Sequence, residues 1–141
     1  MMEAILCEGV SAVAEEAGRE YVEIKIAIME FNSQCRWITE HGPETWEDFV
    51  WEPLTPSKDS AGAARMSGAL AELNDKLSRK GFYDSLHRAY YPPTIIFLTT
   101  GNFADQPEEL KMAIDNINAN GWYRSGSKIG VAIGDDANII N

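Results

Sequence analysis

The sequence predicts an α/β fold in which a mostly parallel sheet is flanked by helices on both faces. Apolar runs at strand spacing alternate along the chain with stretches whose apolar residues recur at helical spacing. This alternation is typical of strands joined by crossover helices. The chain has 141 residues, which suffice for one hydrophobic core and not for two. We therefore expect residues 1–141 to form a single domain.

Four segments predict the strands. Tyr21–Phe31 has the strongest β pattern, because Val, Ile and aromatic residues alternate with Glu and Lys. A turn at Asn32 and Ser33 leads into a short return strand, Cys35–Thr39, at an edge of the sheet. Two later apolar runs, 94–99 and 127–133, are typical of buried parallel strands.

Three segments predict helices through apolar residues spaced three or four apart. The first covers residues 2–17 and ends before Gly18, and the second runs from Met66 to about Lys80, before Gly81. In the third, Asp105 is the expected N-cap, with Glu108 three residues later. The residues expected to form its buried stripe are Leu110, Ala113, Ile114 and Ile117.

The segment between residues 41 and 56 contains three prolines and reads as a loop, with a helical turn predicted at Glu44–Val50. Trp46, Phe49 and Trp51 lie in it, and we expect them to fold back onto the body of the domain. An exposed aromatic binding platform is the alternative interpretation.

Composition excludes several classes of function. The formal net charge of −10 argues against nucleic acid or an anionic membrane as the main partner. No apolar run is long enough to span a membrane, and no basic and apolar leader begins the chain, so we expect a cytoplasmic protein. Cys7 and Cys35 are isolated in sequence and are expected to be reduced thiols, with a disulfide between them as the alternative.

Polar and small residues follow the predicted strands, where open α/β folds place their ligands at the carboxyl edge of the sheet. The candidate binding residues are Asn32, Ser33, Ala64, Ser67, Thr100, Gly101, Asn102 and Asp105. The loop at 99–102 could hold an anion through backbone N–H groups, but the acidic start of the following helix would repel a phosphate. No nucleotide-binding glycine motif and no Ser/His/Asp or Cys/His set is evident, so the sequence predicts a protein that is not an enzyme.

Several stretches, taken in order, resemble a von Willebrand factor A (VWA) domain, of the bacterial type found in TerY-like tellurium-resistance proteins. Residues 6–13 resemble the family's first helix, and residues 22–33, with the core IKIAIMEFNS, resemble its second strand. WEPLTP at 51–56 with GALAEL at 68–73 resembles the loop and helix after the third strand. TIIFLTTG at 94–101 and residues 128–136 resemble the fourth and fifth strands. The resemblance implies a three-layer, Rossmann-like α/β/α fold.

The resemblance also implies Mg²⁺ at a metal-ion-dependent adhesion site, held by oxygen ligands from three loops. The family's first ligand motif, Asp-x-Ser-x-Ser, would precede Met1. Ala64 or a near neighbour stands where the family has a ligand threonine, and Thr100 stands where it has an aspartate. Asp105 matches a later family aspartate, although we interpret it as a helix cap. We therefore expect a degenerate site that holds no metal. Asp135 and Asp136 could bind a cation, but a solvated turn is the preferred interpretation.

The family's first strand, central in its sheet, has no counterpart in this sequence, so the domain is expected to be incomplete at both ends. The resemblance implies a non-catalytic module that binds a protein partner. An alternative is a partial or split domain that forms homo-oligomers, or completes a larger VWA assembly, by pairing its free strand edges. A second alternative is binding of a small anion or a cation at the loops of the carboxyl edge.

Overall fold

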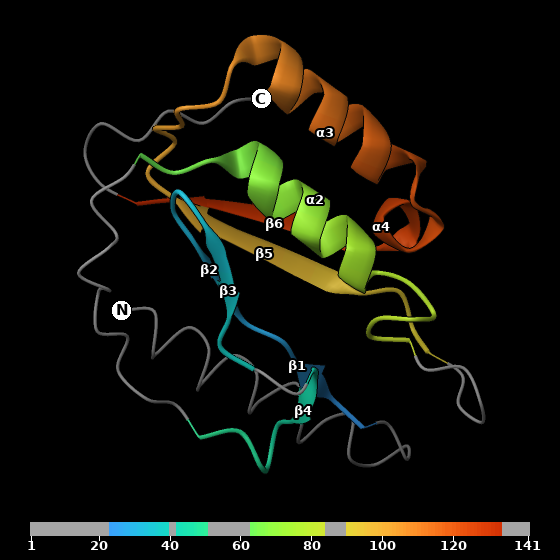
Figure 1. The fold of residues 1–141 in the computed structure, drawn as a ribbon. Helices are drawn as coiled ribbons and strands as arrows, with labels where there is room; N and C mark the ends of the chain where they lie inside the picture. The colour runs from blue at the N-terminus through green and yellow to red at the C-terminus, as the bar shows by residue number, and fades with distance from the viewer. Residues whose placement is uncertain (1–22, 40–41, 51–62, 84–89, 134–141) are drawn as a thin grey trace. The chain divides into compact units, whose positions relative to one another are not determined.

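A computed structural model describes residues 23–39, 42–50, 63–83 and 90–133 (Figure 1). These residues form short strands and helices, so the prediction of a mixed α/β protein is confirmed at that level. The helix predicted for residues 2–17 and the pair Asp135 and Asp136 lie outside the described residues. The chain divides into two compact units, residues 1–28 with 37–54 and residues 29–36 with 55–141.

The first unit contains a small antiparallel pair, β1 (Lys25–Ile26) and β4 (Glu44–Thr45). The side chain of Thr39 is buried, and its hydroxyl accepts a hydrogen bond from the backbone N–H of Ile28 at 3.2 Å. The helical turn predicted at Glu44–Val50 is wrong at its start, because Glu44 and Thr45 pair with β1. A turn begins only afterwards, where the N–H of Phe49 donates to the carbonyl of Thr45 at 3.0 Å.

The strand predicted at Tyr21–Phe31 is interrupted. Its second part is β2 (Met29–Phe31), which pairs with β3 (Cys35–Trp37) in a separate two-stranded sheet. The turn between them is closed by the side chain of Asn32, whose Oδ1 accepts the N–H of Gln34 at 2.9 Å. The predicted turn and return strand are therefore present, although β3 is shorter than expected.

A βαβ unit makes up the centre of the second unit. Strands β5 (Thr94–Thr99) and β6 (Ser127–Ala132) pair in parallel, with Ile96 opposite Ile129. Helices α3 (Pro107–Ala119) and α4 (Gly121–Ser125) connect them. Parallel neighbours need such a crossover connection, so the alternating sequence pattern predicted this part correctly.

The helix α2 (Met66–Lys76) packs against α3, and both lie on the same side of the β5–β6 pair (Figure 1). Apolar side chains from α2, α3 and the segment after α2 form the buried core: Ala69, Leu70, Leu73, Leu77, Tyr83 and Ile117. The helix α2 ends at Lys76, earlier than predicted. The predicted burial of Ile114 is also wrong, because its side chain is 40% exposed on α3.

Asn120 is the C-cap of α3 and the N-cap of α4. Its Oδ1 accepts hydrogen bonds from the N–H groups of Trp122 and Tyr123 at 2.9 and 3.3 Å. Its Nδ2 donates to Asn74 Oδ1 at 2.9 Å and to the carbonyl of Leu77 at 3.0 Å. One side chain thus caps α4 and satisfies carbonyl groups at the end of α2.

Within the described ranges the strands form three separate two-stranded sheets. The β1–β4 pair is antiparallel and the β5–β6 pair is parallel. A single continuous sheet between two helical layers is therefore not formed by these residues. The helices of the described part are too short or too polar for any of them to cross a membrane.

Candidate binding groove

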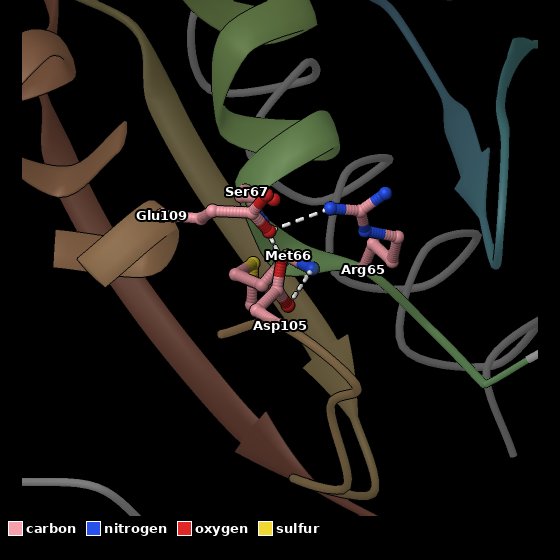
Figure 2. A network of polar contacts seen from close by, with 5 residues as sticks. All are labelled: Arg65, Met66, Ser67, Asp105 and Glu109. Atoms are coloured by element: carbon pink, nitrogen blue, oxygen red, sulfur yellow. Dashed lines mark hydrogen bonds and ion pairs between the residues drawn. The ribbon is translucent and has the colours of Figure 1, made fainter. Parts of the chain in front are cut away.

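The N-terminus of α2 is held by an aspartate from another part of the chain. Asp105 Oδ2 accepts the N–H of Met66 at 2.7 Å, and Oδ1 accepts the N–H of Ser67 at 3.0 Å (Figure 2). The N-cap position of α2 is Arg65, whose side chain cannot accept a hydrogen bond, so these amides need an external acceptor. Asp105 supplies it across 38 residues of sequence.

Backbone pairing brings Asp105 to this position. Ala64 and Phe103 form an isolated parallel bridge, and the N–H of Ala104 donates to the carbonyl of Ala64 at 2.9 Å. Asp105 was predicted to cap the helix that follows it, and that prediction is wrong. The N-cap of α3 is Gln106, which makes no side-chain cap hydrogen bond.

Two effects of opposite sign act on the pKa of Asp105. Partial burial tends to raise it, but the hydrogen bonds from Ser67 and Met66, together with the positive charge of Arg65, outweigh that effect. The net pKa lies below its ordinary value of 3.8. The carboxylate is therefore ionised at neutral pH and engaged with the start of α2.

A second contact joins the same two segments. The guanidinium of Arg65 lies 2.6 Å from the carboxylate of Glu109 in the first turn of α3, as Figure 2 shows. Both side chains are about half exposed, so the ion pair contributes little to the stability of the fold. It does place one positive and one negative charge next to each other at the start of the two helices. The acidic first turn also suits the positive end of the α3 dipole.

An open groove lies beside this ion pair, lined by the turn after β2, the first half of α2 and one face of α3. Its volume is about 410 Å³. We call it the α2–α3 groove, and its lining residues are Asn32, Ser33, Cys35, Arg65, Ser67, Gly68, Ala71, Glu109, Met112, Ala113 and Asn116. Small residues line it on both helices, while the side chain of Met112 is 62% exposed. Such a surface combines apolar contact area with hydrogen-bonding groups at its ends.

The thiol of Cys35 is free and half buried in the groove wall. A Cβ atom added to Gly68 would lie 3.8 Å from its sulfur, an ordinary van der Waals contact. Burial, and to a smaller extent the negative charge of Glu72, raise the pKa of Cys35 above its usual 9.0. A thiol in this environment is a poor nucleophile near neutral pH.

The structure brings together part of the predicted binding set. Asn32, Ser33 and Ser67 line the α2–α3 groove. Ala64 and Asp105 lie next to it, through the bridge and the cap that hold α2.

The other three predicted residues, Thr100, Gly101 and Asn102, are not among the groove residues. They follow β5, and the chain bends at Gly101, whose φ of 80° is a conformation that favours glycine. The N–H of Gly101 donates to Thr99 Oγ1 at 3.0 Å, so this amide group already has an acceptor at the end of β5.

Sequence reasoning missed most of the groove residues on the helices. Gly68 and Ala71 on α2, and Ala113 and Asn116 on α3, are each three residues apart and therefore share a helix face. Small residues at this spacing were the available signal, but a sequence does not show that the two faces meet.

The residues do not fit the Mg²⁺ site that the VWA resemblance implies. Ala64 has no side-chain oxygen, and both carboxylate oxygens of Asp105 already accept amide hydrogens. Thr100 is exposed and offers one hydroxyl in place of a carboxylate. In the part of the chain that the structure describes, no three His, Cys, Asp or Glu side chains gather as metal ligands.

Comparison with known proteins gives no matching family model, no matching curated protein and no matching solved structure.

Proposed function

We propose that this chain is a non-catalytic protein-interaction module of VWA type, without a functional metal site, and that it contacts its partner through the α2–α3 groove. The observation that carries the proposal is the groove itself. It lies beside the end of β2 and the N-termini of α2 and α3. Three of the binding residues predicted from the sequence, Asn32, Ser33 and Ser67, line it.

The chemistry of the groove favours binding over catalysis. Its two charged side chains, Arg65 and Glu109, form an ion pair with each other. Cys35 is its only thiol, and the raised pKa of Cys35 is the opposite of what a catalytic thiolate needs. Exposed Met112 offers the flexible apolar side chain that protein-binding surfaces often use.

The absence of family ligands supports the metal-free part of the proposal. The carboxylate of Asp105 would have to release the N–H groups of Met66 and Ser67 before it could bind a cation. That release would leave two amides at the start of α2 without acceptors, which is costly when they are shielded from water. Calorimetry with Mg²⁺ and with Mn²⁺ is expected to show no binding, and micromolar affinity for either ion would contradict the proposal.

Site-specific photocrosslinking tests the binding surface. A photoreactive amino acid replaces Met112 in the groove or, as a control, Asn118, which is exposed on α3 and does not line the groove. In cells of the natural source, we expect one discrete adduct from position 112 and none from position 118.

A blocking variant makes the result specific. Ala71→Arg places a long charged side chain into the groove and should abolish the adduct, while Asn118→Arg should leave it unchanged. Identical adducts from both positions, no adduct from position 112, or an adduct that survives Ala71→Arg would each contradict the proposal.

A further inference from the structure

Three segments of the chain meet at the start of α2, at one end of the α2–α3 groove. The N–H of Arg65 donates to the carbonyl of Asn32 at 2.8 Å, which ties the turn after β2 to the helix. From the loop after β5, Asp105 accepts the N–H of Ser67 at 3.0 Å. Asn32, Arg65 and Ser67 line the groove, whereas Asp105 does not. A residue outside the groove therefore holds one of the polar residues inside it.

Asp105 also holds the hydroxyl group of Ser67. A hydrogen bond with the Ser67 side chain is among the causes that lower the pKa of the Asp105 carboxyl. An ionised carboxylate accepts hydrogen bonds and cannot donate them, so the hydroxyl of Ser67 is the donor in this bond. A serine hydroxyl has one hydrogen and two lone pairs. Because its hydrogen is directed to Asp105, the hydroxyl of Ser67 can offer a molecule in the groove only an acceptor.

The second serine that lines the groove has the same polarity. The hydroxyl of Ser33 donates to Asn32 Oδ1 at 3.4 Å, and the same oxygen accepts the N–H of Gln34 at 2.9 Å. The contact of Ser33 is long and exposed, so its hydroxyl is held less firmly. Both hydroxyls nevertheless direct their hydrogens to other groups of this chain, and acceptors are what remains for a bound partner.

We propose that Asp105 determines the specificity of the α2–α3 groove at this end, because it holds the hydroxyl of Ser67 as an acceptor and so selects a partner group that donates, an N–H or an O–H. The inference rests on the proposed function, since it concerns one contact of the protein that binds in the groove. A partner that presented a carbonyl or carboxylate oxygen to Ser67 would either break the bond to Asp105 or leave two acceptors facing each other. Either outcome costs binding energy where water is excluded.

Substitutions separate this role from the capping of α2. Ser67→Ala removes the hydroxyl but keeps the backbone N–H that Asp105 caps, whereas Ser67→Thr keeps both. Asn120→Ala weakens the other end of α2, where the Asn120 side chain bonds to the carbonyl of Leu77, and neither of these residues lines the groove. It is therefore the control for a loss of stability that leaves the groove contact unchanged.

The test measures the dissociation constant of the protein that the photoreactive group at position 112 captures, after that protein has been identified by mass spectrometry and purified. Ser67→Ala and Asp105→Ala should each raise the constant about threefold to tenfold, as expected for loss of one hydrogen bond. The double substitution should raise it no further than either alone, because Asp105 acts through Ser67. Ser67→Thr should retain the affinity of the natural protein. Asn120→Ala should do so as well, although it destabilises the fold.

A crystal structure of the complex identifies the partner atom at this contact. We expect an N–H or O–H donor within hydrogen-bond distance of Ser67 Oγ, and a carbonyl or carboxylate oxygen there would overturn the inference. Full affinity of Ser67→Ala, additive effects of the two substitutions, or an equal loss of affinity in Asn120→Ala would overturn it too. Those results leave the groove proposal standing. Absence of an adduct from position 112 would instead contradict the groove proposal, and this inference with it.

Discussion

Asp105 Oδ2 accepts the backbone N–H of Met66 at 2.7 Å, and this bond ties the loop after β5 to the first turn of α2. The second oxygen of the carboxylate accepts the N–H of Ser67. The loop that leads into α3 therefore caps α2, and the two helices are joined at their N-terminal ends. At the other end, the side chain of Asn120 joins the last carbonyls of α2 to the first amides of α4.

Removing the cap of α2 should destabilise the protein. Asp105→Ala leaves the N–H groups of Met66 and Ser67 without acceptors, and loss of such a cap typically costs about 1 kcal/mol of unfolding free energy. Asp115→Ala, at an exposed position of α3, is the control and should change it by less than about 0.5 kcal/mol. Urea denaturation followed by circular dichroism measures both. Equal effects of the two substitutions would contradict the capping role.

The same carboxylate makes stability depend on pH in the acid range. Its pKa is lower in the folded protein than the ordinary value of 3.8, so the unfolded chain takes up its proton first as pH falls. The stabilisation is fully present above the unfolded pKa, and it is lost as pH falls through the folded pKa. Between about pH 6 and about pH 3, the stability difference between the natural protein and Asp105→Ala should shrink. A difference that stays constant over this window would rule out the linkage.

Asn120 should contribute more than an ordinary surface residue. Asn120→Ala removes the cap of α4 and the hydrogen bonds to Asn74 and Leu77, and we expect a loss of about 2 kcal/mol. Asn118→Ala makes the same change of side chain two residues earlier, at an exposed position, and should be close to neutral. Thermal and urea unfolding of the two variants provide the comparison. A neutral Asn120→Ala would show that water replaces these bonds without loss.

Two glycines near β6 should respond differently to alanine. A Cβ atom at Gly126 would lie 2.5 Å from the carbonyl oxygen of Pro93, at the point where the ladder of β5 and β6 begins. Relief of such a contact requires the backbone to shift, which typically costs about 1–3 kcal/mol. At Gly130 a Cβ atom would meet nothing within 4 Å, so Gly130→Ala should be tolerated. Equal stability of the two variants would contradict the close approach of Gly126 to Pro93.

The thiol of Cys35 should react slowly with alkylating reagents. Burial and the charge of Glu72 raise its pKa, which lowers the thiolate fraction at any pH below that value. In a Cys7→Ser background, modification by iodoacetamide near neutral pH should be slower in the folded protein than in urea. Rates should increase with pH beyond 9.0, the ordinary value for this group. Faster reaction of the folded protein would contradict the description of the groove wall.

Local patterns predicted the local structures well. Short apolar runs located β5 and β6, and the polar residues at Asn32 and Ser33 predicted the turn that the side chain of Asn32 closes. Errors arose where a neighbouring segment competes for a group. Asp105 with Glu108 has the pattern of a local capping box, but the bridge between Ala64 and Phe103 presents Asp105 to another helix. The strand at Tyr21–Phe31 is likewise divided, because its two parts pair with different partners.

By itself the sequence determined the α/β class, the positions of β5, α3 and β6, and part of the candidate binding set, because each of these depends on spacing and propensity within a few residues. Only the tertiary structure decided which helix Asp105 caps and which helix faces enclose the α2–α3 groove. Those features depend on contacts between residues far apart in sequence. Their partners are set by how the elements pack, and no local pattern encodes that packing.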